Sequence, residues 1–192
     1  MPRMTLPRAF KVAFVGTHGV GKTTLCYGLA ARLKARDVVL EVVHEVARRC
    51  PLPINEETGV ASESWILHTE IAEEVVAAAR HPVVVCDRSA LDNYVYLLLA
   101  AGPRDGLDQL VQHWMGTYDL LIHVPIVTLP SADGVRATDP EFQRAVDERL
   151  ERELATRGLP VHKLDPAERQ HWLHVAERLV WQRVQPRQLA LL

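Results

Sequence analysis

Lysine and cysteine are both scarce in this chain of 192 residues. Of the 22 basic side chains, 18 are arginine and four are lysine, and the three cysteines, Cys26, Cys50 and Cys86, lie far apart. An odd number of widely spaced cysteines supports neither a disulfide framework nor a paired-cysteine metal site. We therefore expect reduced cysteines that act as small apolar side chains, and each lysine can be considered individually.

Long apolar runs and a strong net charge are also missing. No window approaches the roughly 18 apolar residues of a membrane span, and the first ten residues lack the apolar core of a secretory signal. A net charge of -2 gives no general attraction to duplex DNA or to an anionic membrane. We expect a cytoplasmic protein with no membrane partner.

The remaining composition is that of a soluble domain, with 48% hydrophobic and 24% charged residues. Short apolar runs alternate with longer amphipathic stretches, which predicts an α/β fold with helices on both faces of a parallel sheet. The length favours one domain over residues 1–192. The predicted strands are 10–15, 38–43, 83–86, 120–124 and 159–164, and the predicted helices are 22–36, 62–80, 90–101, 106–115, 140–157 and 166–184.

A glycine-rich motif follows the first predicted strand directly. Its residues are Gly16, Thr17, His18, Gly19, Val20, Gly21, Lys22 and Thr23, which match G-x-x-x-x-G-K-[ST] between a strand and a helix. Glycines at this spacing let backbone N–H groups surround phosphates at the positive end of a helix. The motif predicts a P-loop in which Lys22 contacts the phosphates, Thr23 ligates Mg²⁺, and Thr24 completes the nucleotide site.

A second acidic position stands at the end of the third predicted strand. Asp87 follows an apolar run, at the sheet edge where ligands of open α/β sheets bind, and suits a contact to Mg²⁺. Arg88 follows it, where motor ATPases usually place a glutamate that activates water. This residue order disfavours a hydrolytic motor and offers a cation for a phosphoryl group or a substrate.

The P-loop together with Asp87-Arg88-Ser89 resembles the P-loop nucleoside and nucleotide kinases, in the branch of thymidylate kinase, deoxynucleoside kinases and NadR-type ribosylnicotinamide kinases. The run Asp133-Gly134-Val135-Arg136 is also similar to small bacterial ATP-binding proteins labelled AAA. The resemblance spans about residues 10–180. It implies a three-layer P-loop NTPase fold with a five-stranded parallel sheet and a short lid, which binds ATP and Mg²⁺ and transfers a phosphoryl group.

The same resemblance implies roles for residues at the matching positions. Asp87 corresponds to an acidic residue that such kinases use near Mg²⁺ or as a base, and Arg88 to an arginine that touches the acceptor or a phosphate. Thymidylate kinases carry Asp-Arg-aromatic-x-x-Ser, whereas this chain has Ser89 and Asp92 at the last two defined positions. The departure disfavours thymidylate. Asp92 is then either a hydrogen-bond partner of a neutral, hydroxyl-bearing acceptor or a solvated helix residue.

The second predicted strand ends before Glu45, and deoxynucleoside kinases use a glutamate at this place to take the proton from the acceptor hydroxyl. Glu45 is therefore the candidate base. Arg48 and Arg49 are either ligands of an acceptor phosphate or a coat on a helical turn. Trp65 and His68, on the next predicted helix, are either stacking partners of the acceptor base or packing residues.

A long stretch without periodicity corresponds to the lid of such kinases, over about residues 125–144. A lid brings a cation to the γ-phosphate, and Arg136 is the candidate, with Arg144 on the following helix as a second.

The sequence thus predicts a Mg²⁺-dependent kinase that transfers the γ-phosphoryl of ATP to a hydroxyl of a small nucleoside-like acceptor. The sequence leaves ATP and GTP open as donors, since it carries no guanine-binding signature and adenine is often held by loop backbone and stacking; ATP is taken as the default. A nucleotide-dependent switch with slow hydrolysis is one alternative. A 5′-hydroxyl polynucleotide kinase is another: the near-neutral charge disfavours nucleic acid, but Arg48, Arg49, Arg88 and Arg104 could form a local basic groove. The apolar tail, residues 189–192, is a candidate contact for a homodimer.

Overall fold

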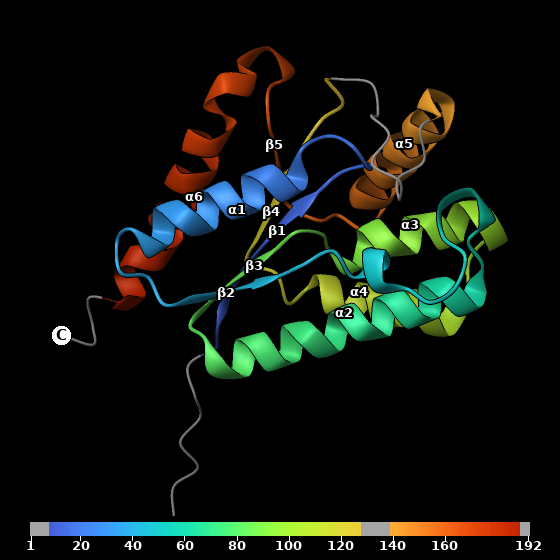
Figure 1. Cartoon of the computed structure of the whole chain (residues 1–192), viewed down its shortest axis with the longest axis horizontal. Coiled ribbons are helices and arrows are strands. Elements are labelled where there is room, and N and C mark those ends of the chain that lie inside the picture. The colour runs from blue at the N-terminus through green and yellow to red at the C-terminus, as the bar shows by residue number, and fades with distance from the viewer. Residues whose placement is uncertain (1–7, 128–138, 189–192) are drawn as a thin grey trace, which may run out of the picture.

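The computed structural model describes residues 8–127 and 139–188, whose five strands form one sheet (Figure 1). The strand order is β2-β3-β1-β4-β5, and every neighbouring pair is parallel. This confirms the predicted five-stranded parallel sheet. The strands are β1 Phe10–Val15, β2 Leu40–Val43, β3 Val83–Cys86, β4 Leu120–His123 and β5 Val161–Lys163.

Helices cover both faces of this sheet, as predicted. Val12 and Phe14 of β1 point into one apolar cluster, whereas Ala13 and Val15 point into another on the opposite face. The first cluster is shared with α1 (Lys22–Lys34) and α6 (Trp172–Gln188); the second is shared with α2 (Val60–Arg80), α3 (Ala90–Ala101), α4 (Asp105–Met115) and α5 (Pro140–Thr156). The continuous apolarity of the strands follows from burial on both sides. The architecture is the expected three-layer fold.

The last predicted helix was wrong in its first part. Residues Pro166–His171 form a 3₁₀ helix, η3, in which Glu168 has non-helical backbone angles, and α6 begins only at Trp172. Trp172 is buried, and its indole N–H donates to the Asp165 carbonyl at 2.7 Å. Burial of this large side chain therefore sets where the continuous helix begins. Two further 3₁₀ helices, η1 (Val46–Arg49) and η2 (Asn55–Glu57), lie between β2 and α2.

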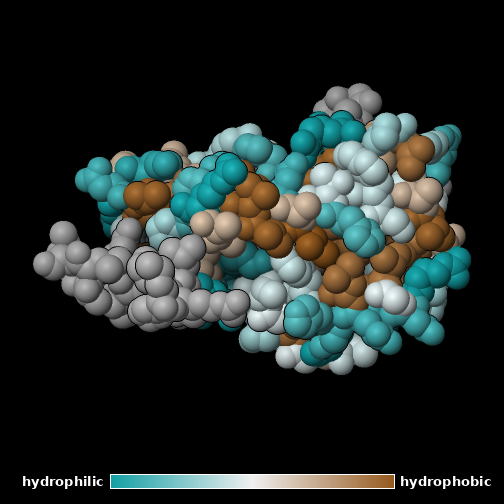
Figure 2. Space-filling view, turned by 90° about the horizontal axis from the view of Figure 1, so that it is seen from below, coloured by the Kyte–Doolittle hydropathy of each residue, from teal (hydrophilic) through white to brown (hydrophobic). Residues whose placement is uncertain are grey.

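Helix α2 buries three glutamates and exposes two valines, which is the opposite of the usual arrangement. Glu63, Glu70 and Glu74 are each at most 4% exposed, whereas Val75 and Val76 are about half exposed, at 52% and 49%. Figure 2 shows the molecule of Figure 1 from below, so that the side on which α2 lies faces the viewer. Apolar surface is visible along this side. Glutamates are almost never fully buried unless they are partnered. The inward carboxylates of α2 therefore call for an explanation in terms of what they contact.

Part of the predicted lid, with Arg136 and the run 133–136, lies outside the described residues, as does the apolar tail 189–192. Within residues 8–127 and 139–188, no helix is long and apolar enough to cross a membrane.

Candidate active site

Three segments that carry predicted site residues meet at the carboxyl edge of the sheet. The neighbouring strands β2, β3 and β1 are parallel, with Val43 opposite Cys86 and Cys86 opposite Ala13. The residues that follow these strands therefore emerge side by side: Glu45 after β2, Asp87 and Arg88 after β3, and the P-loop after β1. The edge of an open α/β sheet where the strand order changes direction is the usual place for a ligand.

The P-loop connects β1 to α1 through backbone that only glycine adopts easily. Gly16, Gly19 and Gly21 have φ angles of 151°, 76° and 95°. A side chain at Gly16 is excluded a second time, because its Cβ would lie 2.6 Å from the Val124 carbonyl oxygen. The loop is thus shaped by backbone conformation, as phosphate binding by N–H groups requires.

Lys22 lies buried on the inside of this loop. Its ammonium group donates to the Gly16 and Thr17 carbonyls at 2.5 and 2.6 Å. Burial, together with the nearby charge of Arg88, lowers the pKa of Lys22 to about 8. A cation held in this way is stabilised by any anion that enters the loop.

Thr23 and Asp87 form the pair expected to hold the metal. The Thr23 hydroxyl donates to Asp87 Oδ2 at 2.8 Å, and burial raises the pKa of Asp87. The other carboxylate oxygen, Oδ1, is buried and has no partner within the described part of the chain. A hydroxyl and a carboxylate with unused acceptor capacity are hard oxygen donors of the kind that Mg²⁺ prefers, so these two residues fit the ion.

Glu45 and Arg88 form a largely buried ion pair beside the metal residues. Arg88 Nε and Nη2 lie 2.8 and 2.6 Å from Glu45 Oε1, and Arg48 Nε lies 2.8 Å from Oε2. Burial alone would raise the pKa of Glu45, but the charges of Arg88 and Lys22 outweigh it and hold the pKa at about 2. Arg88 Nη1 is buried without a partner in the described ranges. It therefore has a donor left for an incoming oxygen.

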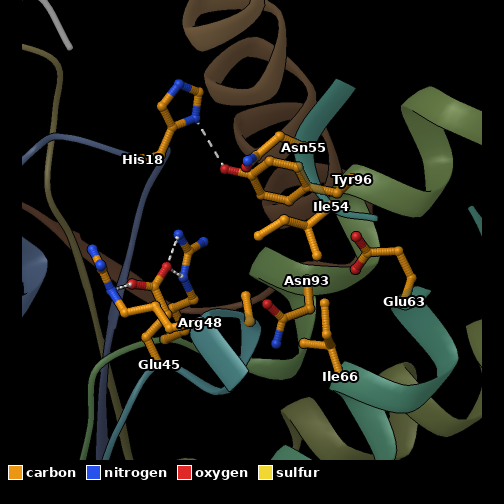
Figure 3. A pocket seen from close by; sticks show the side chains of 11 residues that line it. His18, Glu45, Arg48, Ile54, Asn55, Glu63, Ile66, Asn93 and Tyr96 are labelled. Carbon is orange, nitrogen blue, oxygen red and sulfur yellow. Dashed lines mark hydrogen bonds and ion pairs between the residues drawn. The ribbon is translucent and has the colours of Figure 1, made fainter. Parts of the chain in front are cut away.

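Two adjoining pockets occupy this edge, and three residues, His18, Glu45 and Arg88, line both. The first is the phosphate pocket, formed by the P-loop with Asp87. The second, which we call the acceptor pocket, extends over η1, η2, α2 and α3 (Figure 3). Its other lining residues are Ala47, Arg48, Ile54, Asn55, Glu63, Ile66, Asn93 and Tyr96.

Asp92 has a different place from either of those expected. It is buried, which excludes a solvated helix residue, and it lines neither pocket. Its Oδ2 accepts from the N–H and hydroxyl of Ser89, which caps α3, and its Oδ1 accepts from Gly16 N–H at 2.8 Å. The carboxylate thereby joins the start of α3 to the start of the P-loop, and these bonds place it away from the acceptor.

Trp65 and His68 also lie outside the acceptor pocket. His68 is exposed and stays against its own helix, with Nδ1 2.7 Å from the Ser64 carbonyl oxygen. Helix α2 does line the pocket, but through Glu63 and Ile66. The sequence held a signal for this face: Glu63, Glu70 and Glu74 share the helical phase of Ile66 and Leu67.

Gln143 is a contact that the sequence did not suggest. Its side-chain Nε2 donates to the backbone carbonyl of His18 at 2.8 Å, and its backbone carbonyl accepts from the Thr17 hydroxyl at 3.0 Å. Helix α5, whose first turn forms the end of the predicted lid, is thereby bonded to the P-loop. Arg144, the next residue, is exposed and lines neither described pocket. Thr24 is likewise exposed, on the first turn of α1.

A protein-family model described as an AAA domain matches residues 11–171. The chain belongs to this AAA-domain family. The match covers the whole site, from β1 to the end of η3, and agrees with the resemblance to AAA-labelled ATP-binding proteins. No curated protein matches this AAA-domain chain.

Solved structures similar to this AAA-domain protein include three kinases or related proteins. A deoxyadenosine kinase from M. mycoides with bound dATP has a TM-score of 0.62 at 15% identity, over 89% of this chain and 98% of that one. A NadR protein in complex with NR has a TM-score of 0.65 at 24% identity, over 91% of this chain and 51% of that one. A thymidylate kinase from Ehrlichia chaffeensis has a TM-score of 0.62 at 16% identity, over 92% and 100%. At these identities the likeness shows the fold, which is the one expected for P-loop nucleoside and nucleotide kinases.

Proposed function

We propose that this protein is a Mg²⁺-dependent phosphotransferase that moves the γ-phosphoryl group of ATP to a hydroxyl of a small, nucleoside-like acceptor. The observation that carries the proposal is the junction of the two pockets at His18, Glu45 and Arg88. A phosphate site that opens onto a second, partly apolar site is the arrangement that transfer between two bound molecules requires.

The residues of the two pockets have separate roles in the proposed transfer. The P-loop amides and Lys22 hold the phosphates, and Thr23 with Asp87 would hold Mg²⁺, which offsets phosphate charge when it is bound. The spare Nη1 of Arg88 would donate to the transferred group, while Glu45 accepts a hydrogen bond from the acceptor hydroxyl. The hydroxyl oxygen forms the new bond to the γ-phosphorus as the bond between this phosphorus and the β,γ-bridging oxygen breaks. The electron pair of the broken bond leaves with ADP. Arg136 and Arg144 are the proposed lid cations.

Glu45 acts in this scheme more by orientation than by strong basicity. A pKa of about 2 makes it a weak base at neutral pH, although one that is always ionised. Phosphoryl transfer passes through a loose transition state that makes little demand on early proton removal. The pair with Arg88 keeps one oxygen fixed, so that the carboxylate can align the acceptor hydroxyl and receive its proton late.

The acceptor pocket must widen to admit such a substrate. Its free volume is about 30 Å³, whereas pockets for small molecules usually measure roughly 300–1,000 Å³. One wall is the segment between β2 and α2 that contains η1 and η2, and it carries Arg48, Ile54 and Asn55. We infer that this segment moves outward when the acceptor binds, in the manner of substrate-gated loops.

The direct test is a transfer assay with γ-labelled ATP, Mg²⁺ and a panel of nucleosides, nucleoside monophosphates and a 5′-hydroxyl oligonucleotide. We expect label on at least one nucleoside, and transfer that is about 10³-fold slower or more in Lys22→Met. Label on the oligonucleotide, with binding that weakens steeply as salt rises, would support the polynucleotide kinase instead. Persistent hydrolysis with no labelled acceptor would contradict the proposal.

A nucleotide-dependent switch is the second candidate, and the bond between α5 and the P-loop favours it. Gln143 contacts the backbone of His18, so a change in the loop when phosphate binds is transmitted to α5. The switch predicts that ATP and ADP give different hydrogen-exchange protection in α5, that Gln143→Leu removes the difference, and that hydrolysis does not depend on an acceptor. Equal protection with ATP and ADP would exclude it.

A further inference from the structure

We propose that Glu63 selects acceptors whose ring carries an amino or carboxamide group, by accepting a hydrogen bond from its N–H. This inference rests on the proposed function, since it concerns the acceptor of that reaction. It names the class of acceptor and a specificity-determining residue that the sequence motifs do not indicate.

Glu63 is a buried carboxyl group that faces the acceptor pocket. It lies on the first turn of α2, is 4% exposed, and its Oε1 accepts from the Thr58 hydroxyl at 2.6 Å. No described basic side chain forms an ion pair with it, because both arginines of the pocket, Arg48 and Arg88, bond to Glu45. The carboxyl group therefore keeps acceptor capacity for a ligand.

Asn93 adds a second acceptor to the lining of this pocket. Its Nδ2 donates one N–H to buried Glu70, and its Oδ1 can accept a hydrogen bond from a ligand. Figure 3 shows Glu63 across the pocket from Glu45 and Arg48, with Asn93 between the two sides in this view. A ligand group that meets two acceptors must supply donors, as the two N–H groups of an amino or carboxamide substituent do.

Ile54, Ile66 and Tyr96 give the same pocket apolar surface. Such apolar walls suit the faces of a flat heterocycle, whose edge then points to Glu63. A ring carbonyl in the amino position would set oxygen against oxygen, and a phosphate or carboxylate there would set like charges together. Both are costly in a buried site because the polar groups stay unpaired.

The pH dependence of ligand preference gives a second way to detect the role of the Glu63 carboxyl group. Burial raises the pKa of Glu63 to about 7, so the side chain is largely protonated at pH 6 and ionised at pH 8. A protonated carboxyl group can donate to a ring carbonyl, whereas the ionised one only accepts. Preference for the amino ligand should therefore rise between pH 6 and pH 8.

The test measures binding of three matched pairs by calorimetry, with a non-hydrolysable ATP analogue and Mg²⁺ present. The pairs are adenosine and inosine, cytidine and uridine, and nicotinamide riboside and nicotinic acid riboside. We expect at least one amino or carboxamide member to bind about tenfold more tightly than its partner at pH 8. In Glu63→Gln, whose amide both donates and accepts, the ratio should fall to about threefold or less.

Two further variants separate recognition from folding. Glu73→Gln changes a partly exposed carboxyl group on the same helix and should leave the ratio unchanged. Thr58→Val removes the bond that helps ionise Glu63, and should shift the rise of the ratio to higher pH while the variant stays folded.

Equal binding within all three pairs, tighter binding of the carbonyl members, or an unchanged ratio in Glu63→Gln would each overturn the inference, as would the absence of any nucleoside binding. Binding is measured without turnover, so the result is independent of whether phosphoryl transfer occurs. Transfer to inosine and uridine alone would overturn the inference and leave the phosphotransferase intact. Selective binding without transfer would support the role of Glu63 and contradict the phosphotransferase.

Discussion

The phosphate pocket and the acceptor pocket share three residues but are built in opposite ways. The phosphate pocket comes mainly from consecutive residues of one loop, shaped by three glycines at positive φ. The acceptor pocket comes from side chains on η1, η2, α2 and α3, which are spread over much of the chain. Backbone fixes the first and side-chain orientation fixes the second. Changes in the two pockets should therefore differ in kind, with loss of phosphate binding in one and altered selectivity in the other.

Lys22→Met should have the largest effect. It removes the cation inside the P-loop, and we expect kcat for transfer to fall by about 10³-fold or more, the size seen when a group that stabilises transferring phosphate is lost. Lys34→Met, at an exposed lysine of α1, is the matched control and should retain normal transfer. A loss of less than tenfold in Lys22→Met would show that the backbone alone holds the phosphates.

Gly16→Ala should destabilise the whole fold, by about 3 kcal/mol, because the new Cβ meets the Val124 carbonyl oxygen at 2.6 Å in a strained conformation. Gly106→Ala is the matched glycine, since it lies in α4 with open space around it and should stabilise slightly. Urea unfolding of the two variants checks both signs. Equal stabilities would mean that the loop relaxes and that its backbone is not the rigid element.

Glu45→Gln tests the junction between the two pockets. Loss of the carboxylate leaves the buried Arg88 without its charge partner, and we expect about 2–3 kcal/mol of destabilisation and roughly 10²-fold slower transfer. The exposed pair of Arg49 with Glu73 is the control, and Arg49→Gln should cost less than about 1 kcal/mol. Similar losses in the two variants would place the Glu45 pair among ordinary surface contacts.

Glu63→Gln should change how the free energy of unfolding depends on pH, because Glu63 is buried in the acceptor pocket. The pKa of Glu63 is about 7 in the folded protein against 4.5 ordinarily, so between these values the folded state holds a proton that the unfolded state has lost. The free energy of unfolding of the wild type should therefore fall as pH rises from 4.5 to 7, by about 3 kcal/mol relative to Glu63→Gln. Chemical unfolding of both proteins at pH 4, 6 and 8 measures this. A constant difference would show that Glu63 is solvated.

His68→Ala should have the smallest effect, with less than about twofold change in acceptor KM, because the ring lies on the outer face of α2. Ile66→Ala, two residues earlier, faces the pocket and should raise KM about tenfold. A larger effect at His68 than at Ile66 would support the stacking role, one of the two alternatives that the sequence left open.

The difference between the pockets also explains what could be predicted. The sheet, the layers and the P-loop follow from apolar runs and from motif spacing, which are local, and the fold agrees with them. Glu45, Asp87 and Arg88 could be placed together because strand ends share an edge. Trp65 and His68 were preferred over Glu63 and Ile66 because aromatic chemistry outweighed helical phase. Asp92 and Gln143 could not be placed, since each role depends on a loop more than 70 residues away in the chain.

The scarcity of lysine gives the molecule built-in chemical reporters. The four primary amines of its side chains occupy separate environments: Lys34 and Lys163 are exposed, Lys11 is buried against Glu74 and two aromatic rings, and Lys22 lies inside the P-loop. With its pKa at about 8, Lys22 is half uncharged, and so nucleophilic, in mildly alkaline buffer. Acylation followed by peptide mass spectrometry can therefore distinguish the exposed amines of Lys34 and Lys163 from the buried amines of Lys11 and Lys22, and nucleotide that fills the loop should slow the reaction of Lys22 alone. Occupancy of the phosphate pocket can thus be read in the wild-type sequence, without a substitution.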